Sequence, residues 1–566
     1  MSAPGTGRSD DAEDGLFARA AAWRADDPDP RTAAELDALL AAARTGDAPA
    51  LDELRSAFAG QLEFGTAGLR GPLGPGPARM NRVVVSRAAA GLARYLLDTG
   101  HAGGKVLIGH DARHRSGDFA RDTAEIIAGH GLAAVLVEQP IPTPVIAYGI
   151  RALGCVAAVV VTASHNPATD NGYKVYLGDG SQIVPPADAE IADRIAEAGT
   201  RPVAALPRDT GWQPAEPGLL DAYVARAASL LTDTAAPGVP RTALRWVYTA
   251  MHGVGWATVA RVLAAAGLPL PTAVAEQLQP DPDFPTLPFP NPEEPGALDL
   301  AIATATRSDA DLIIANDPDA DRCAIALPAP EGWRVLRGDE LGALLAADLL
   351  GRGARGTYAA SVVSSTLLST MSAAAGQPYV TTLTGFKWIG RVPGLVFGYE
   401  EAIGYCCDPA AVADKDGITT LVRVLDLAGR LAAEGRTLLD LLDEVMRTHG
   451  LHATDQWAVR TSDAAAIAAA MGRLRTAPPG DLAGEAVTVT DLARPGGALP
   501  PTDAILLEGP TVRVVVRPSG TEPKLKCYLQ VRLSAAESTD LTVARAVAAR
   551  RLDRVREQIR AVLALG

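Results

Sequence analysis

The stretch Cys155–Pro167, CVAAVVVTASHNP, joins a run of small and β-branched apolar residues to a polar turn. A continuous apolar run of this kind is typical of a strand buried on both faces of a parallel sheet. Ser164 then lies where the strand ends, between the strand and a His-Asn-Pro turn. A serine in a turn often only bonds backbone groups, and no Gly-x-Ser-x-Gly frame marks a nucleophile elbow here. The role of Ser164 therefore depends on the loops that accompany it.

Further apolar runs alternate with Ala- and Leu-rich helical stretches along most of the chain. This alternation predicts α/β layers. Several of the runs end in polar loops that contain Gly or Pro, namely LRWVYTAMHG, DLIIANDPD, VFGYEEAIGY and VRVVVRPSG. In open α/β sheets, ligands bind beyond the carboxyl ends of the strands, so we expect the chemistry in these loops.

Composition restricts the class of protein. A chain of 566 residues with 48% hydrophobic and 21% charged residues is long enough for about three to five folded domains. The formal net charge of −14 argues against nucleic acid and anionic membrane as partners, so an anionic substrate needs a local basic pocket. We expect no membrane span or signal peptide and a cytoplasmic location. The five cysteines have no CxxC spacing and are expected to be reduced.

Three carboxylates follow the apolar run Leu312–Ala315 in the sequence NDPDADR, residues 316–322. Asp317, Asp319 and Asp321 can converge on one hard cation, and their mutual repulsion is costly without one. The pattern predicts a Mg²⁺ site, with a solvated acidic turn as the plain alternative. An EF-hand is excluded because Arg322 stands where that loop needs Gly. A phosphatase of the haloacid-dehalogenase type stays a weak alternative.

Two later loops have the residue types of a phosphate site and of a sugar site. RPSGTEPKLK, residues 517–526, offers an Arg fork, hydroxyls and free backbone amides that suit a phosphate group, although a surface hairpin is possible. GYEEAIGY, residues 398–405, offers carboxylates that accept hydrogen bonds from vicinal hydroxyls, although such residues are commonly surface charges. Candidate binding residues in these loops and in the nearby TGFKWIG and DKDG segments are Glu400, Glu401, Lys387, Lys415, Arg517, Ser519, Gly520, Thr521 and Lys526.

The N-terminal half adds weaker candidates. EFGTAGLRG, residues 63–71, places Arg70 in a Gly-rich loop, and GHDARHRS adds Arg113 and Arg115. The segment QPDPDFPTLPFPNPEEPG, residues 279–296, is too rich in proline for regular structure and predicts a long loop.

Taken in order, TASHNP, DPDADR, GYEEAIGY and RPSGTEPK resemble the α-D-phosphohexomutases, the family of phosphoglucomutases and phosphomannomutases. The resemblance runs from about residue 60 to 530 and is strongest to the branch of phosphoglucomutase 2 and phosphopentomutase. It implies four domains around a cleft, three related α/β domains and a smaller C-terminal α+β domain. The expected limits are 1–212 including an N-terminal extension, 213–328, 329–449 and 450–566.

The resemblance also implies roles for residues. Ser164 is expected to be a phosphoserine that completes the coordination of Mg²⁺ by the three aspartates. The phosphoryl group then passes to a sugar monophosphate, and a bisphosphate intermediate such as glucose 1,6-bisphosphate returns its other phosphate. Lys174 is expected to transfer protons, and His165, Arg70 and Arg322 are expected to support the phosphoryl group.

The family pattern is broken at the sugar loop. Many members read Gly-Glu-x-Ser-Gly-His, and this chain has Ile403 for Ser and Tyr405 for His. The missing histidine leaves the preferred sugar open among glucose, mannose and pentose phosphates. A glucose 1,6-bisphosphate synthase and an inactive sugar-phosphate sensor are the more distant alternatives. A monomer or homodimer acting on small sugar phosphates is expected.

Overall fold

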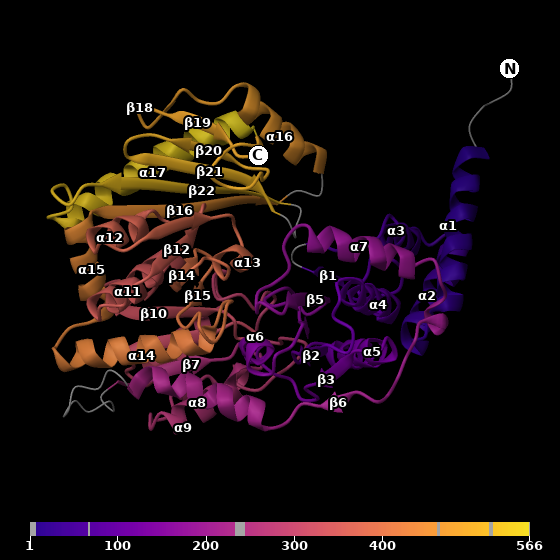
Figure 1. Cartoon of the computed structure of the whole chain (residues 1–566). Helices are drawn as coiled ribbons and strands as arrows, with labels where there is room; N and C mark the ends of the chain where they lie inside the picture. Colours follow the sequence, from indigo (N-terminus) through magenta and orange to yellow (C-terminus); the bar gives the residue numbers. More distant parts are fainter. Residues whose placement is uncertain (1–6, 66–67, 233–243, 461–463, 520–523, 565–566) are drawn as a thin grey trace, which may run out of the picture.

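The computed structural model describes residues 7–65, 68–232, 244–460, 464–519 and 524–564. Four larger β-sheets follow one another along the chain, each with its own helices (Figure 1). Within the described residues, no helix is long and apolar enough to cross a membrane. The cytoplasmic location stays a prediction.

The first sheet has the strand order β1-β5-β4-β2-β3-β6. Its central strands β4, β2 and β3 are parallel, whereas β5 runs antiparallel to β4 and carries Lys174. The quoted apolar run forms β4, in which every residue is buried, so the sheet is covered on both faces as predicted. The elements are β1 (Leu69–Pro72), α4 (Arg82–Asp98), β2 (Lys105–His110), α5 (Ser116–Gly129), β3 (Ala133–Leu136), α6 (Thr143–Ala152), β4 (Ala157–Val161), β5 (Asp170–Leu177), α7 (Ala187–Ala198) and β6 (Gln213–Pro214).

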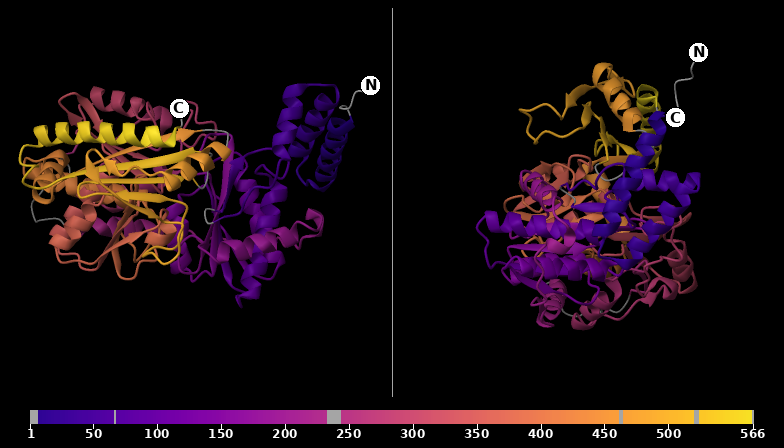
Figure 2. Two further views of the ribbon diagram at one scale, coloured as in Figure 1. Left: turned by 90° about the horizontal axis from the view of Figure 1, so that it is seen from above. Right: turned by 90° about the vertical axis from the view of Figure 1, so that its right-hand side faces the viewer.

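An N-terminal extension precedes this sheet. It consists of α1 (Gly7–Asp26), α2 (Pro30–Arg44) and α3 (Ala48–Ala57). Asp29 and Asp47 accept hydrogen bonds at the starts of α2 and α3, and a proline follows each within two residues, which is a common way to begin a helix. Figure 1 and the left view of Figure 2 place these indigo helices on the far side of the first sheet from the C-terminal sheet.

The second sheet has the order β11-β10-β9-β7-β8, and the third has the order β13-β12-β14-β15. The elements of the second are α8 (Gly218–Thr232), β7 (Trp246–Thr249), α9 (Gly255–Ala265), β8 (Thr272–Ala273), α10 (Asp299–Arg307), β9 (Leu312–Asn316), β10 (Cys323–Ala329) and β11 (Gly332–Val335). The elements of the third are α11 (Gly338–Gly351), β12 (Thr357–Ser361), α12 (Leu367–Ala374), β13 (Tyr379–Thr382), α13 (Phe386–Ile389), β14 (Leu395–Glu400), β15 (Gly404–Cys406), α14 (Gly417–Ala433) and α15 (Leu438–His449).

The fourth sheet, β16-β22-β21-β20-β19, is antiparallel throughout. The terminal helix packs its buried residues Leu552, Val555 and Ile559 inward; their spacing places them on one face of the helix. The elements are β16 (Leu451–Arg460), α16 (Ala464–Thr476), β17 (Asp481–Leu482), β18 (Glu485–Ala486), β19 (Thr488–Asp491), β20 (Ile505–Glu508), β21 (Val512–Pro518), β22 (Lys524–Leu533) and α17 (Leu541–Leu563). The four-domain α/β architecture with a C-terminal α+β domain is confirmed.

Two strands bear on the expected domain limits. β6 pairs with β3 of the first sheet, although the expected limit falls before it at residue 212. β11 pairs with β10 of the second sheet, although the expected limit falls at residue 328, within β10. Backbone hydrogen bonds hold each strand to the preceding sheet. We therefore propose limits a few residues later, after Pro214 and after Val335.

A partly buried histidine predicts a pH dependence of stability where the third and fourth domains meet. His452 on β16 lies 3.0 Å from the Thr366 hydroxyl through Nδ1. Burial, together with Arg532 and His449, lowers the pKa of His452 to about 4. An unfolded histidine titrates near about 6.5. The folded state therefore binds the proton less readily, and stability should fall as the pH drops from about 6.5 toward 4, by at most about 1.4 kcal/mol per pH unit.

The check is urea unfolding of the wild type and of His452→Gln at pH 7.5 and pH 5.0. The wild-type midpoint should decrease more on acidification than that of the variant. Equal decreases for both proteins would contradict the assignment.

Candidate active site

The turn that follows β4, residues 162–167, is held in one conformation by Arg113. Its guanidinium donates to the carbonyl oxygens of Ser164 and Asn166, both at 2.6 Å, and of Pro167 at 2.7 Å. Ser164 has a φ of 52°, in the left-handed region that costs a non-glycine residue roughly 1–2 kcal/mol. Such a conformation persists only where the surroundings determine it. The Ser164 hydroxyl is thus placed by the fold.

The loop after β9, residues 317–322, carries the three aspartates. Asp317, Asp319 and Asp321 are fully buried, and one carboxylate oxygen from each lies within 4.8 Å of the others. The predicted convergence of the triad is therefore present in the structure, and the solvated acidic turn is not.

The serine turn and the aspartate loop meet, although they lie far apart in the sequence. The Ser164 hydroxyl donates to Asp317 Oδ2 at 3.0 Å. Thr143, at the start of α6, donates through Oγ1 to Asp319 Oδ2 at 2.6 Å, and its backbone N–H donates to the carbonyl of the same residue at 3.0 Å. The first domain thus contacts the second directly at the site.

Cations from two domains balance the triad. Lys174 Nζ lies 2.6 Å from Asp319 Oδ2 and 2.8 Å from Asp321 Oδ2. Lys415 Nζ, from the third domain, lies 3.4 Å from Asp321 Oδ2. Burial alone would lower the pKa of Lys174, but the two carboxylates outweigh it and raise the pKa. Both lysines are therefore held as ammonium groups.

Arg322 extends this network. Its Nε lies 3.9 Å from Asp317 Oδ2 and 3.7 Å from Asp321 Oδ1. A side chain at Gly417 would place its Cβ only 2.2 Å from the Arg322 carbonyl oxygen. Glycine at this position therefore allows the start of α14 to approach the aspartate loop closely.

The donor set fits a hard divalent cation. The second oxygens of Asp319 and Asp321 are buried and accept no hydrogen bond from any residue that the structure describes. Burial and the two neighbouring carboxylates raise the pKa of Asp317 well above its ordinary value. Buried carboxylate oxygens without a hydrogen bond are the kind of ligand that Mg²⁺ takes.

His165 and Arg70 flank Ser164. His165 Nδ1 lies 4.0 Å from Asp317 Oδ2, and burial together with Arg322 and Arg70 lowers the pKa of this imidazole well below its usual value. Arg70 on β1 donates to the Asn166 side-chain oxygen at 3.4 Å. Arg115, in contrast, pairs with Asp29 and Asp118 away from the site, so only Arg113 of the GHDARHRS segment reaches it.

The predicted sugar loop forms two strands, β14 and β15, rather than one. Glu400 is buried, and burial raises its pKa against the opposing effect of Lys415 and Arg322. Glu401 Oε2 accepts hydrogen bonds from Ser361 at 3.1 Å and from Ser364 at 3.3 Å. Tyr405 is buried and donates to the Gly338 carbonyl at 3.0 Å. It therefore stabilises the third domain and takes no place in the cleft.

A basic cluster lies toward the fourth domain. Burial, Arg517 and Arg391 lower the pKa of Lys387 to about 8 against the opposing effect of Asp188. Burial also lowers the pKa of Lys526. The nearby cations Lys524 and Arg517 lower this pKa further, whereas Glu401 raises it. The backbone N–H of Ser519 donates to the carbonyl of Lys524 at 2.8 Å. The predicted phosphate-loop residues Gly520 and Thr521 lie outside the described residues.

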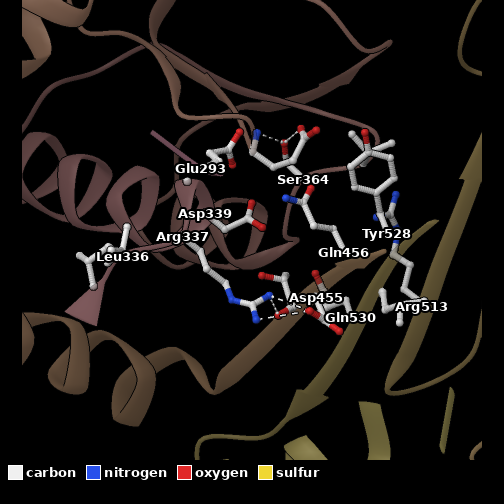
Figure 3. A pocket seen from close by; sticks show the side chains of 16 residues that line it. Glu293, Leu336, Arg337, Asp339, Ser364, Asp455, Gln456, Arg513, Tyr528 and Gln530 are labelled. Atoms are coloured by element: carbon white, nitrogen blue, oxygen red, sulfur yellow. Dashed lines mark hydrogen bonds and ion pairs between the residues drawn. The ribbon is translucent and has the colours of Figure 1, made fainter. Parts of the chain in front are cut away.

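A pocket of about 240 Å³ opens between the third and fourth domains (Figure 3). Its wall includes Ser364 and Glu401 of the third domain and Tyr528 and Gln530 of the fourth. It also includes Glu293, from the proline-rich segment of the second domain. Neither Glu293 nor Thr143 was singled out from the sequence, because nothing in the local pattern distinguishes a Glu after Pro or a Thr before Pro from a surface residue.

Comparison with known proteins agrees with this geometry. Residues 61–201, 221–330, 337–449 and 410–548 match the phosphoglucomutase/phosphomannomutase alpha/beta/alpha domains I, II and III and the C-terminal domain. The chain belongs to the phosphoglucomutase/phosphomannomutase family. It is therefore a mutase acting on phosphosugars, as the sequence motifs predicted.

Relatives in this family differ in the sugar that their names give. A probable phosphomannomutase from Haemophilus influenzae is 45% identical over 473 residues, which cover 82% of this chain and 96% of that protein. A probable phosphoribomutase from Schizosaccharomyces pombe is 35% identical over 526 residues, which cover 85% and 88%. A crystal structure of a putative phosphomannomutase from Thermus Thermophilus has a TM-score of 0.66 at 24% identity and covers 87% of this chain and 99% of that one, so it supports the fold.

The role of Arg113 predicts that this residue cannot be replaced by lysine. In Arg113→Lys, one ammonium group cannot reach the four carbonyls that the guanidinium binds, those of Ser164, Asn166, Pro167 and Asp170. A lost charged hydrogen bond costs about 1.5–3 kcal/mol. We expect phosphosugar turnover to fall at least about tenfold and the thermal midpoint to decrease. The matched control is Arg115→Lys, a neighbouring arginine directed away from the site, which should keep turnover near that of the wild type. Equal activity of the two variants would contradict this role.

Proposed function

We propose that this mutase moves a phosphoryl group between Ser164 and a bound sugar phosphate, and so interconverts the 1-phosphate with the 6-phosphate of a hexose or the 5-phosphate of a pentose. The observation that supports this is the contact of the Ser164 hydroxyl with Asp317, 3.0 Å away across two domains. A serine that served only its own turn would bond the local backbone.

The aspartate triad is the proposed Mg²⁺ site. When bound there, Mg²⁺ would supply neutralisation of the charge on the transferring phosphoryl group. Asp317, Asp319 and Asp321 would hold it, and a phosphate oxygen on Ser164 would lie beside it because Ser164 already contacts Asp317.

The transfer balances in two half-reactions. A free sugar hydroxyl attacks the phosphorus of phosphoserine, the bond to Ser164 Oγ breaks, Ser164 Oγ takes up a proton, and the sugar hydroxyl gives one up. The sugar bisphosphate then presents its other phosphate. Ser164 Oγ attacks that phosphorus and gives up its proton, the bond from phosphorus to the sugar oxygen breaks, and that oxygen takes up a proton. We assign proton transfer to Lys174, which contacts the same aspartate loop as Ser164. Its ammonium group would give a proton to the departing oxygen, and the neutral amine would then take the proton of the attacking hydroxyl. His165, Arg70 and Arg322 stabilise the charge around the phosphoryl group.

The phosphate that does not react would bind in the basic cluster. Arg517 lies close enough to Lys387 and Lys526 to lower the pKa of both, and an anion relieves this repulsion. Ser519 belongs to the same loop, and Gly520 and Thr521 are proposed to complete it. Glu400, Glu401 and Lys415 would then face the sugar ring between the two phosphates.

The sugar that the enzyme prefers depends on the side chains that line the pocket, because the phosphoryl transfer itself is the same for each sugar. Relatives named for mannose and ribose phosphates cover most of the chain, and we propose a phosphoglucomutase-like enzyme with breadth across hexose and pentose phosphates. A phosphomannomutase or phosphopentomutase is the second candidate. Glucose 1,6-bisphosphate, or an equivalent sugar bisphosphate, is proposed as the activator that loads Ser164.

Turnover of the purified protein tests this proposal. With Mg²⁺ and a trace of glucose 1,6-bisphosphate, glucose 1-phosphate, mannose 1-phosphate and ribose 1-phosphate should be converted with measurable and unequal kcat/KM. Chelation of the metal should abolish conversion, because the triad then carries no cation to neutralise the phosphoryl charge. Absence of conversion of all three sugars by folded, metal-loaded protein would overturn the proposal.

The phosphoenzyme provides a second test. Glucose 1,6-bisphosphate carrying a radioactive phosphate should label the wild type, and the label should map to the peptide that contains Ser164. Ser164→Ala should take up no label and should lose turnover by at least about 10³-fold, since it removes the nucleophile. Thr169→Ala, which removes an exposed hydroxyl at the end of the same turn, should be labelled normally. Label on Ser164→Ala would disprove the assignment.

A further inference from the structure

The proline-rich connection between the 3₁₀ turn Ala275–Gln277 and α10 touches the active site at two places. Near its start, the buried Phe284 ring lies 4.8 Å from the guanidinium of Arg113, the residue that fixes the Ser164 turn. Near its end, Glu293 lines the pocket between the third and fourth domains. One segment of the second domain therefore contacts both the phosphoryl end and the sugar end of the proposed site.

The connection is held in place by its own hydrogen bonds. Thr286 Oγ1 lies 2.8 Å from His252 Nε2 and 2.9 Å from Gln277 Nε2. The backbone N–H of Glu293 donates to the Asn291 side chain at 3.1 Å. Pro292 precedes Glu293 and fixes the backbone further. The position of Glu293 is thus set before any ligand binds.

The side chain of Glu293 is accessible from the pocket and lies at the end occupied by Ser364 (Figure 3). Its carboxylate forms no hydrogen bond or ion pair with any residue that the structure describes. The neighbouring carboxylate of Glu401, in contrast, already accepts from Ser361 and Ser364. Of these two acids, Glu293 therefore keeps its full hydrogen-bonding capacity for a ligand.

The charges around Glu293 indicate which part of a ligand it meets. Protein surrounds Glu293 on most sides, although its side chain still reaches solvent. This burial favours the uncharged acid and raises the pKa of Glu293 to about 7. Arg322 and Lys526 attract its carboxylate, while Glu400 and Glu401 repel it. A phosphate dianion would be repelled by three acidic side chains. A hydroxyl group is uncharged and can both donate to a carboxylate and accept from a carboxylic acid.

We propose that Glu293 determines sugar specificity by hydrogen-bonding a ring hydroxyl of the bound sugar phosphate, as a third acidic residue beside Glu400 and Glu401. This inference rests on the proposed function. It assigns to the second domain a direct contact with the sugar, in addition to its aspartate loop.

The experiment compares Glu293→Gln with Glu276→Gln and the wild type, all phosphorylated and with Mg²⁺. Glu276 lies on the 3₁₀ turn from which the same connection starts, is exposed and does not line the pocket, so its variant makes the identical chemical change elsewhere. The substrates are glucose 1-phosphate and its 2-, 3- and 4-deoxy analogues. The measured quantities are kcat/KM for each sugar and the inhibition constant of inorganic phosphate.

Glu293→Gln should lower kcat/KM for glucose 1-phosphate about tenfold, because a neutral amide oxygen accepts a hydrogen bond from a substrate hydroxyl more weakly than a carboxylate does. It should also reduce the wild-type discrimination against one deoxy analogue, and it should leave the inhibition constant of phosphate unchanged. Glu276→Gln should match the wild type throughout.

Two results would overturn the inference. Deoxy-sugar ratios of Glu293→Gln that equal those of the control would show that this residue does not contact a hydroxyl. Weaker inhibition by inorganic phosphate, with unchanged deoxy-sugar ratios, would place Glu293 at the phosphate instead. The wild type is measured first. If it converts none of the sugars, the proposed function itself fails, and this result does not depend on any variant.

Discussion

The burial of three carboxylates on one short loop is the constraint on which the rest of the site depends. Asp317, Asp319 and Asp321 are fully shielded from solvent, and their repulsion in a medium of low polarity is costly unless cations neutralise it. The protein supplies Lys174 from the first domain and Lys415 from the third. The domains therefore meet around this charge, and the same meeting brings Ser164 to Asp317. The need to neutralise three buried carboxylates therefore both holds the domains together and assembles the proposed site.

The opposite requirement holds at the other end of the cleft. Lys387, Arg517 and Lys526 come together there in a chain whose formal net charge is −14, and burial and neighbouring cations lower the pKa of both lysines. At the triad, one buried oxygen of Asp319 and one of Asp321 accept no hydrogen bond from the described part of the chain. A divalent cation at the triad and a phosphate group at the basic cluster would satisfy both ends. The overall charge of a chain thus says little about its site, because local clustering determines the field that a ligand meets.

Sequence alone predicted those features that lie close together along the chain. A buried strand followed by Ser164, and three aspartates at alternate positions, are recognisable because one local pattern sets both the backbone and the side chains. The fold class followed from the same alternation. The contacts of Thr143 with Asp319 and of Arg113 with the Ser164 turn depend on how distant segments pack, which no local pattern encodes. The assignment of residue roles stays a prediction until the variants are measured.

Tyr405 shows why a departure from a motif need not alter chemistry. Its ring is buried and its hydroxyl donates to the Gly338 carbonyl, so the substituted position supports the third domain from within. Ile403 beside it is also buried. These two substitutions therefore cannot select a sugar by direct contact. Selection must come from side chains that reach the pocket, and the pocket wall is shared by the second, third and fourth domains. Specificity in this arrangement depends on how the domains are placed around the ligand, and a change at Ile403 or Tyr405 alone should alter it little.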